Sequence, residues 1–215
     1  LQAKGALREA EPLFREALAT TGSMGEDLLT AEILHNLGGF LLLKGRHDEA
    51  VRAHREEIAI RRRILGDFHP DVAESLKDLA VVLGTSGRMD EAERINREAL
   101  EILRKIYKDD HPDVASAMTT LASAVERKNP SEAERLFRNA LAMRRKLLGN
   151  FHPDVAWTLY NYAYFLYNKK DFRKAAGLAD EILRMRGRVL PEEHILVNSA
   201  LQLTGLCLME TGDLQ

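Results

Sequence analysis

The residues best suited to chemistry in this sequence are the histidines and aspartates of a recurring phrase. His-Pro-Asp stands at 69–71, 111–113 and 152–154. An imidazole close to a carboxylate could act in acid–base catalysis or hold a zinc ion. A zinc site, however, needs ligands that converge within about 2 Å of one ion. The spacing of the phrase decides whether these side chains can meet.

That spacing is regular and predicts an internal repeat. His69, His111, His152 and His194 lie 42, 41 and 42 residues apart. Histidines at equivalent points of successive repeats stand about one repeat width apart, so no metal site is predicted among them. A second marker, an alanine that follows a short polar pair, keeps the same steps at Ala50, Ala92, Ala133 and Ala175, and Ala10 extends it upstream by 40.

The phrase is better explained as a helix start. Proline at the first helical position loses no hydrogen bond and presets φ, and an aspartate in the first turn favours the positive end of the helix. Helices are therefore expected to begin at Pro70, Pro112 and Pro153.

The apolar residues within each repeat follow a helical period. Steps of three and four predict one buried stripe on a helix, and Gly87 marks the turn before a second, longer helix. No stretch has the strict alternation of a half-buried strand. The sequence predicts an all-α fold of helix pairs, A then B, and the stripe of the second repeat comprises Val72, Leu76, Leu79, Ala80 and Leu83.

A period near 42 could fit HEAT or armadillo repeats, or a lengthened tetratricopeptide repeat. Helix A has a small residue twelve positions before the helix B alanine, as in Gly38 to Ala50. This spacing favours the lengthened tetratricopeptide repeat. The phrases LREAEPLFREAL (7–18), MDEAERINREALEI (89–102) and LGDFHPDVAESL (65–76) resemble the long repeats of the kinesin light chain group. This resemblance implies an α-solenoid, a right-handed superhelix of antiparallel pairs whose A helices line a concave groove.

The repeat boundaries predict a single array over residues 1–215 with about ten helices. A helix B at 1–25, with Gly5 at its turn, is followed by repeats at 26–67, 68–110, 111–150 and 151–193 and by a helix A at 194–215. Beginning and ending inside a repeat suggests a piece of a longer protein. The last helix should leave Leu201 or Leu208 partly exposed, which would favour self-association.

Composition, charge and the absence of known catalytic motifs argue against several classes of function. The net charge of −2 gives no electrostatic case for nucleic acid or an anionic membrane, and no apolar run approaches the length of a bilayer span. No phosphate-binding loop, HExxH or GxSxG motif is present, and Cys207 sits among leucines as a packed thiol. We expect a non-enzymatic protein without cofactor or metal, with the cytoplasm as the default location.

The candidate binding residues concentrate on one helix. In the repeat at 151–193, four aromatic residues fall at the positions that the groove would expose: Trp157, Tyr160, Tyr164 and Tyr167. The core stripe of that helix is already filled by Val155, Leu159, Tyr162, Ala163 and Leu166. The aromatic stripe therefore needs another partner, either a peptide or a neighbouring segment such as the next repeat.

Polar residues extend this candidate site. The resemblance implies that asparagines just before the small residue hold the backbone of a bound peptide, and Asn36 and Asn161 match, whereas Asp78 and Thr120 do not. Lys77 and Arg127 could pair with acidic ligand residues. Val81 stands where a carboxylate clamp would need asparagine, which argues against binding of chaperone tails.

These observations predict a protein-interaction module, an adaptor or scaffold that binds a peptide or partner segment in its groove. The alternative is a structural or regulatory array that packs against other domains of a larger signalling protein.

Overall fold

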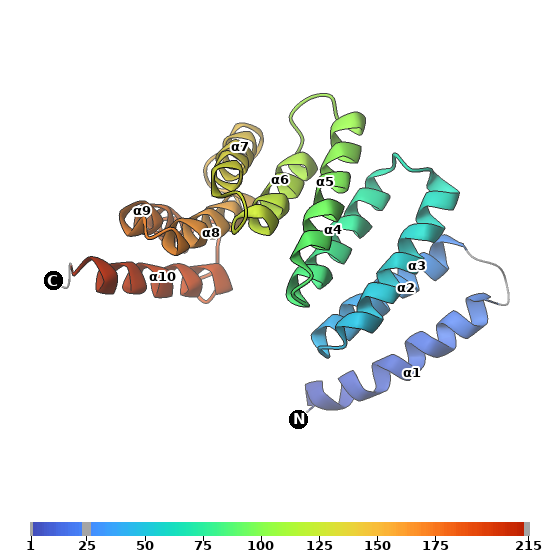
Figure 1. The fold of residues 1–215 in the computed structure, drawn as a ribbon. Coiled ribbons are helices and arrows are strands. Elements are labelled where there is room, and N and C mark those ends of the chain that lie inside the picture. Colours follow the sequence, from blue (N-terminus) through green and yellow to red (C-terminus); the bar gives the residue numbers. More distant parts are fainter. Residues whose placement is uncertain (1, 23–26, 213–215) are drawn as a thin grey trace. The chain divides into compact units, whose positions relative to one another are not determined.

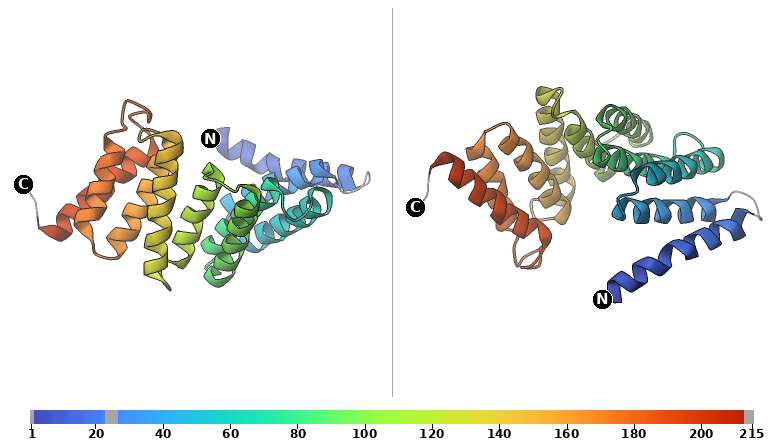
Figure 2. Two further views of the ribbon diagram at one scale, coloured as in Figure 1. Left: turned by 90° about the horizontal axis from the view of Figure 1, so that it is seen from above. Right: turned by 60° about the horizontal axis from the view of Figure 1, so that its bottom comes forward.

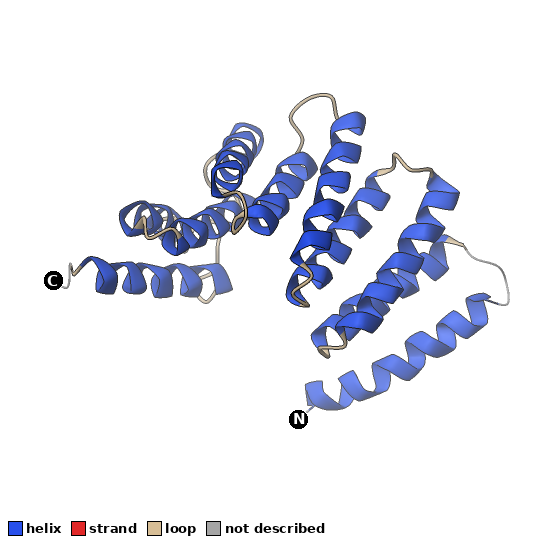
Figure 3. Ribbon diagram, viewed as in Figure 1, coloured by secondary structure: helices blue, strands red, loops and turns tan. Residues whose placement is uncertain are grey.

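The computed structural model describes residues 2–22 and 27–212, with side chains from residue 10 to 21 and from 27 onward. Within these residues the chain forms ten α-helices and no strand (Figures 1 and 3). The helices are α1 (Gln2–Gly22), α2 (Leu28–Leu43), α3 (His47–Leu65), α4 (Pro70–Thr85), α5 (Met89–Ile106), α6 (Pro112–Val125), α7 (Pro130–Leu148), α8 (Pro153–Asn168), α9 (Phe172–Leu183) and α10 (Ile195–Thr211). The predicted all-α fold is confirmed.

The helices fall into two compact units. Unit 1 holds α1 to α5 (residues 1–108), and unit 2 holds α6 to α10 (residues 109–215). In each unit, helices that follow one another along the chain pack side by side (Figure 2). The pairs α2/α3, α4/α5, α6/α7 and α8/α9 are the predicted A/B pairs.

The His-Pro-Asp phrase starts helices as expected, and its histidine has a role that the sequence pattern did not reveal. Proline opens α4, α6 and α8, and the histidine before it is the N-cap residue. Nδ1 of His152 accepts a hydrogen bond from the backbone N–H of Asp154 at 3.1 Å, and His69 and His111 do the same at 3.2 Å. The ring therefore satisfies an N–H group that the helix itself leaves unpaired.

The predicted core stripe is buried. Val72, Leu76, Leu79, Ala80 and Leu83 are each at most 3% exposed on α4. The corresponding stripe of α8 is buried too, and its Tyr162 stacks on Phe137 of α7. Period and burial agree because each A helix buries this face against its neighbours.

Arginines near the ends of two B helices join consecutive helices. Arg144 of α7, only 5% exposed, donates to the Asp154 carbonyl at 2.7 Å and to Oγ1 of Thr158 at 2.6 Å, both on α8. In unit 1, Arg61 of α3 makes the same two contacts with Asp71 and Ser75 of α4. The preference of cations for the negative end of a helix does not by itself predict these contacts.

The chain ends differ in part from the expectation. Gly5 lies inside α1, so the turn predicted there is wrong. A single glycine costs a helix only about 1 kcal/mol relative to alanine, too little to end one by itself. Positions 23–25 of the predicted first helix and 213–215 of the last lie outside the described residues. Among the helices of the described part, none has the length and apolar character needed to cross a membrane.

Candidate protein-interaction face

Three aromatic residues form a row along the exposed side of α8 in unit 2. Trp157 and Tyr164 are 48% and 49% exposed, and Tyr160 between them is half-buried. The ring centroids of Trp157 and Tyr160 lie 6.4 Å apart, and those of Tyr160 and Tyr164 also lie 6.4 Å apart. These separations are typical of interacting aromatic pairs. Trp157, Tyr160 and Tyr164 are called the aromatic row below.

Tyr167 continues the predicted stripe but has a partner in the fold. Its ring meets Phe172 at the start of α9 edge-on, with centroids 5.4 Å apart. On the opposite side of α8, Tyr162 and Phe165 are buried against Phe137. One helix thus carries a packed aromatic face and an exposed one.

The exposed row lies outside the buried core of unit 2. Within the described residues, the hydroxyl groups of Tyr160 and Tyr164 make no hydrogen bond with another protein group. A large apolar surface with an available polar end is typical of residues that dominate recognition surfaces.

The surroundings of the row differ on its two sides. On α10, which packs against α8, the positions equivalent to Tyr164 and Tyr167 hold Leu206 and Met209, exposed by 37% and 68%. On α6 the positions equivalent to Trp157, Tyr160 and Tyr164 hold the small polar residues Ser116, Thr119 and Ser123, and Thr119 is buried with its hydroxyl bonded to the Ala115 carbonyl. The exposed face is therefore more apolar toward α10 than toward α6.

The remaining predicted site residues are divided between the two units. In unit 2, Arg127 is exposed in the turn after α6, and the amide of Asn161 donates to the Trp157 carbonyl at 2.8 Å. In unit 1, Asn36 is exposed on α2, and Lys77 of α4 is buried with its ammonium paired to Glu74. Arg127, Asn161 and the aromatic residues therefore lie in unit 2, and Asn36 and Lys77 lie in unit 1.

Two shallow hollows occur at equivalent places on the two units. A hollow of about 300 Å³ contains Phe68 beside Lys105, and one of about 350 Å³ contains Phe151, which lies 5.3 Å from the Arg188 guanidinium. Both recur with the repeat and are lined by groups that already pair with one another, so they belong to the repeat architecture.

Sequence reasoning missed a polar cluster inside unit 1. His54 and Glu57 of α3 are 2% and 0% exposed, and Nδ1 of His54 lies 2.8 Å from a Glu57 oxygen. Burial acts to raise the pKa of Glu57, but hydrogen bonds from His54 and Ser75 hold that pKa below its ordinary value. The available signal was the repeat itself, since Glu57 falls in register with alanine at 99 and 140.

The comparisons with known proteins agree with this fold. The family model described as "Tetratricopeptide repeat" matches residues 29–105, 84–146 and 124–188. The chain belongs to the tetratricopeptide repeat family. Tetratricopeptide repeats are generally protein-interaction modules, and the family is generally non-catalytic. No curated protein matches the sequence.

Solved structures place these tetratricopeptide repeats near kinesin-light-chain-like proteins in fold. BtubC (BKLC) from P. vanneervenii is similar with a TM-score of 0.81 and 21% identity, over 97% of this chain and 85% of that chain. A candidate kinesin light chain from Podosopora anserina with nearly identical TPR-like repeats has a TM-score of 0.71 and 21% identity, over 88% and 90% of the two chains. At this identity the similarity concerns the fold.

Proposed function

We propose that this tetratricopeptide repeat protein binds a segment of a partner protein on the aromatic row of α8. The observation that carries the proposal is the exposure of Trp157 and Tyr164, each near one half, beside a buried core stripe on the other side of the same helix. Burying both side chains under a partner would remove a large apolar area from water.

The chemistry of the row favours a ligand with a large apolar side chain. Such an anchor would pack against Tyr164 and extend toward Leu206 and Met209 of α10, which are exposed at the equivalent positions. The hydroxyls of Tyr160 and Tyr164 are available to the backbone of an extended segment. Arg127 at the end of α6 suits an acidic residue of the ligand.

A displayed peptide library tests the proposal directly. Binders are selected on the intact protein, and their affinity is then measured for the wild type and for Trp157→Ala and Tyr164→Ala. Truncation of a central aromatic anchor typically costs about 2 kcal/mol or more, which corresponds to at least a thirtyfold loss of affinity. The control is Phe68→Ala, which removes an aromatic side chain that is 57% exposed on unit 1.

Two outcomes would contradict the proposal. Selected peptides could bind the Tyr164 variant as tightly as the wild type, or circular dichroism could show that the Tyr164 variant loses its helical structure. The second outcome would assign the row to the stability of the array. The alternative function, a repeat array that packs against other domains of a larger signalling protein, would be favoured by an adjoining kinase or nucleotide-binding domain.

A further inference from the structure

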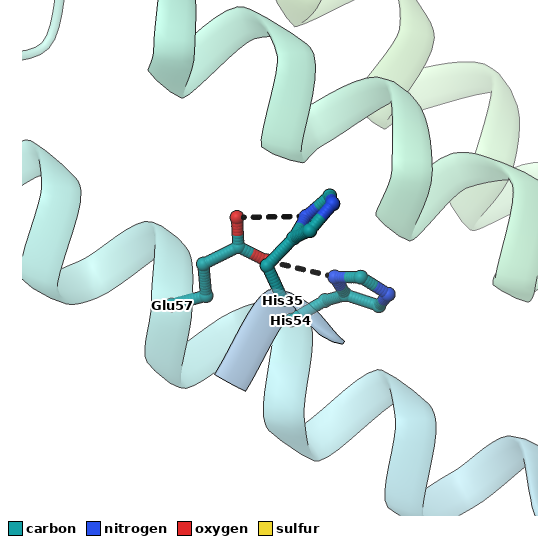
Figure 4. A group of neighbouring side chains, drawn as sticks. All are labelled: His35, His54 and Glu57. Atoms are coloured by element: carbon teal, nitrogen blue, oxygen red, sulfur yellow. Dashed lines mark hydrogen bonds and ion pairs between the residues drawn. The ribbon is translucent and has the colours of Figure 1, made fainter. Parts of the chain in front are cut away.

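The polar cluster of unit 1 brings two imidazoles to one carboxylate. His35 comes from α2, and His54 and Glu57 come from α3. One donor atom from each lies within 4.8 Å of the others. Figure 4 shows both rings facing the Glu57 carboxylate, where His54 Nδ1 lies 2.8 Å from one oxygen and His35 Nδ1 lies 3.3 Å from the other.

The fold does not require a charged residue at the position of Glu57. In the later repeats the position of Glu57 is apolar and fully buried, so the helix packing can be completed there without charge. A buried carboxylate costs free energy unless its partners offset the loss of water. The equivalents of Glu57 are Ala99, Ala140 and Ile182, those of His54 are Asn96, Phe137 and Ala179, and those of His35 are Lys77, Thr119 and Tyr160.

Gly38 leaves the space that the His54 ring occupies. The equivalent close-packing position holds alanine in the next three repeats, at 80, 122 and 163. A β-carbon at Gly38 would lie 2.6 Å from Nε2 of His54, closer than atoms can approach. Unit 1 therefore uses glycine at the one place where alanine would displace this imidazole.

The Nδ1 atom of His35 indicates that the cluster lacks a cation. Nδ1 of His35 is buried and has no hydrogen bond, although it lies 3.3 Å from Glu57 and 3.6 Å from Oδ2 of Asp78 on α4. A buried ring nitrogen is normally paired. A cation placed between these groups would accept the lone pair of the neutral His35 ring. It would also balance the charges of the Glu57 and Asp78 carboxylates.

We propose that His35, His54 and Glu57 bind a zinc ion and that the Asp78 carboxylate, which lies 3.6 Å from His35 but outside this close group, turns in as the fourth ligand. Zinc accepts imidazole nitrogen and carboxylate oxygen, and tetrahedral bonds of about 2.0–2.1 Å place neighbouring ligand atoms about 3.3 Å apart. His54 and His35 lie 2.8 and 3.3 Å from different oxygens of Glu57, and one donor atom of each of the three residues lies within 4.8 Å of the others, so small side-chain movements would bring the donors to that spacing. His54 then carries its hydrogen on Nε2 and leaves Nδ1 free to bind.

The surroundings support a structural zinc site with an access route. Ser75 donates to Glu57 at 2.7 Å and Arg61 lies 3.3 Å from the same oxygen, so the carboxylate is held in place by neighbouring groups. The side chains of His35 and Asp78 are 38% and 36% exposed, which leaves one side open to solvent. The ion would join α2, α3 and α4 and so link two successive repeats.

Zinc titration of the protein without a histidine tag, after removal of metal with a chelator, tests the proposal. Isothermal titration calorimetry should give one site per chain, and the thermal midpoint should rise with zinc. The variants His35→Thr, His54→Asn and Glu57→Ala each introduce the residue that a later repeat holds at that position, so they are compatible with the fold. Each should lower the affinity at least about tenfold and reduce the zinc-dependent rise in midpoint.

The control is His152→Asn, which removes a histidine from unit 2 but keeps a residue that caps helices well. It should bind zinc like the wild type. Cobalt gives a second readout, because a tetrahedral site with these ligands produces visible absorption that the Glu57→Ala variant should lose. Absence of stoichiometric binding by the wild type, or unchanged affinity in all three variants, would overturn the proposal.

Discussion

Some residues of types that could take part in catalysis or metal binding stabilise helices in this protein. The histidines of the recurring phrase illustrate the point, because each one accepts a hydrogen bond from the N–H group two residues further on. Sequence reasoning identified the proline and the aspartate as helix-start signals. The repeat spacing argued against a metal site among these histidines, but it could not assign the capping role, since spacing does not show which group the ring hydrogen-bonds.

The capping role predicts the result of a paired substitution. His152→Ala removes the acceptor for the Asp154 N–H and should lower the free energy of unfolding by about 1 kcal/mol. His152→Asn supplies an amide oxygen in the same place and should recover most of that loss. Urea denaturation followed by circular dichroism measures both, and equal losses in the two variants would contradict the assignment.

The single cysteine should react slowly in the folded protein. Cys207 is 1% exposed, and burial raises its pKa, which reduces the fraction of reactive thiolate at a given pH. A disulfide-exchange reagent at pH 8 should therefore label native protein much more slowly than protein in denaturant. Rapid labelling of native protein would show that the thiol is open to solvent.

Helices and their pairing were the most predictable features of the molecule. The period of 41 to 42 residues predicted ten helices, and the stripe from Val72 to Leu83 identified the buried side of α4 because period and burial are linked. Contacts between side chains of different helices were not predictable in the same way. The cluster of His35, His54 and Glu57 and the reach of Arg144 to α8 depend on how each helix is rotated against its neighbour.

The helical period of the aromatic residues predicted which side of α8 they occupy, but not which other helices contact them. It placed Trp157, Tyr160, Tyr164 and Tyr167 on one side of α8, but it could not reveal that Phe172 of the following helix would cover the last of them. The contact between Tyr167 and Phe172 depends on the turn that joins α8 to α9. Whether the other three bind a partner stays a prediction.

The link between α7 and α8 should contribute to the stability of unit 2. Arg144→Ala removes donors to the Asp154 carbonyl and to Thr158, and should lower the free energy of unfolding by about 1.5–3 kcal/mol. The matched control is Lys146→Ala, since that side chain is 74% exposed and pairs with Asp110, so its loss should lower the stability much less than the loss of Arg144. Equal effects in thermal denaturation would contradict the role given to Arg144.

At the scale of the whole molecule, each unit combines a repeated core with residues that only one repeat carries. The core residues recur because every A/B pair must bury the same face. The aromatic row of unit 2 and the histidine–glutamate cluster of unit 1 do not recur, so repeat packing alone does not account for them. Both proposals rest on this contrast, and each concerns a separate unit.

Fluorescence of Trp157 tests the central proposal most directly, because this residue is the only tryptophan in the sequence and lies in the aromatic row. Titration with a selected partner peptide should shift its emission to shorter wavelength as the exposed indole loses contact with water. The same titration of the Tyr164→Ala variant should need at least thirty times more peptide. A peptide that binds tightly without changing the Trp157 emission would contradict the account.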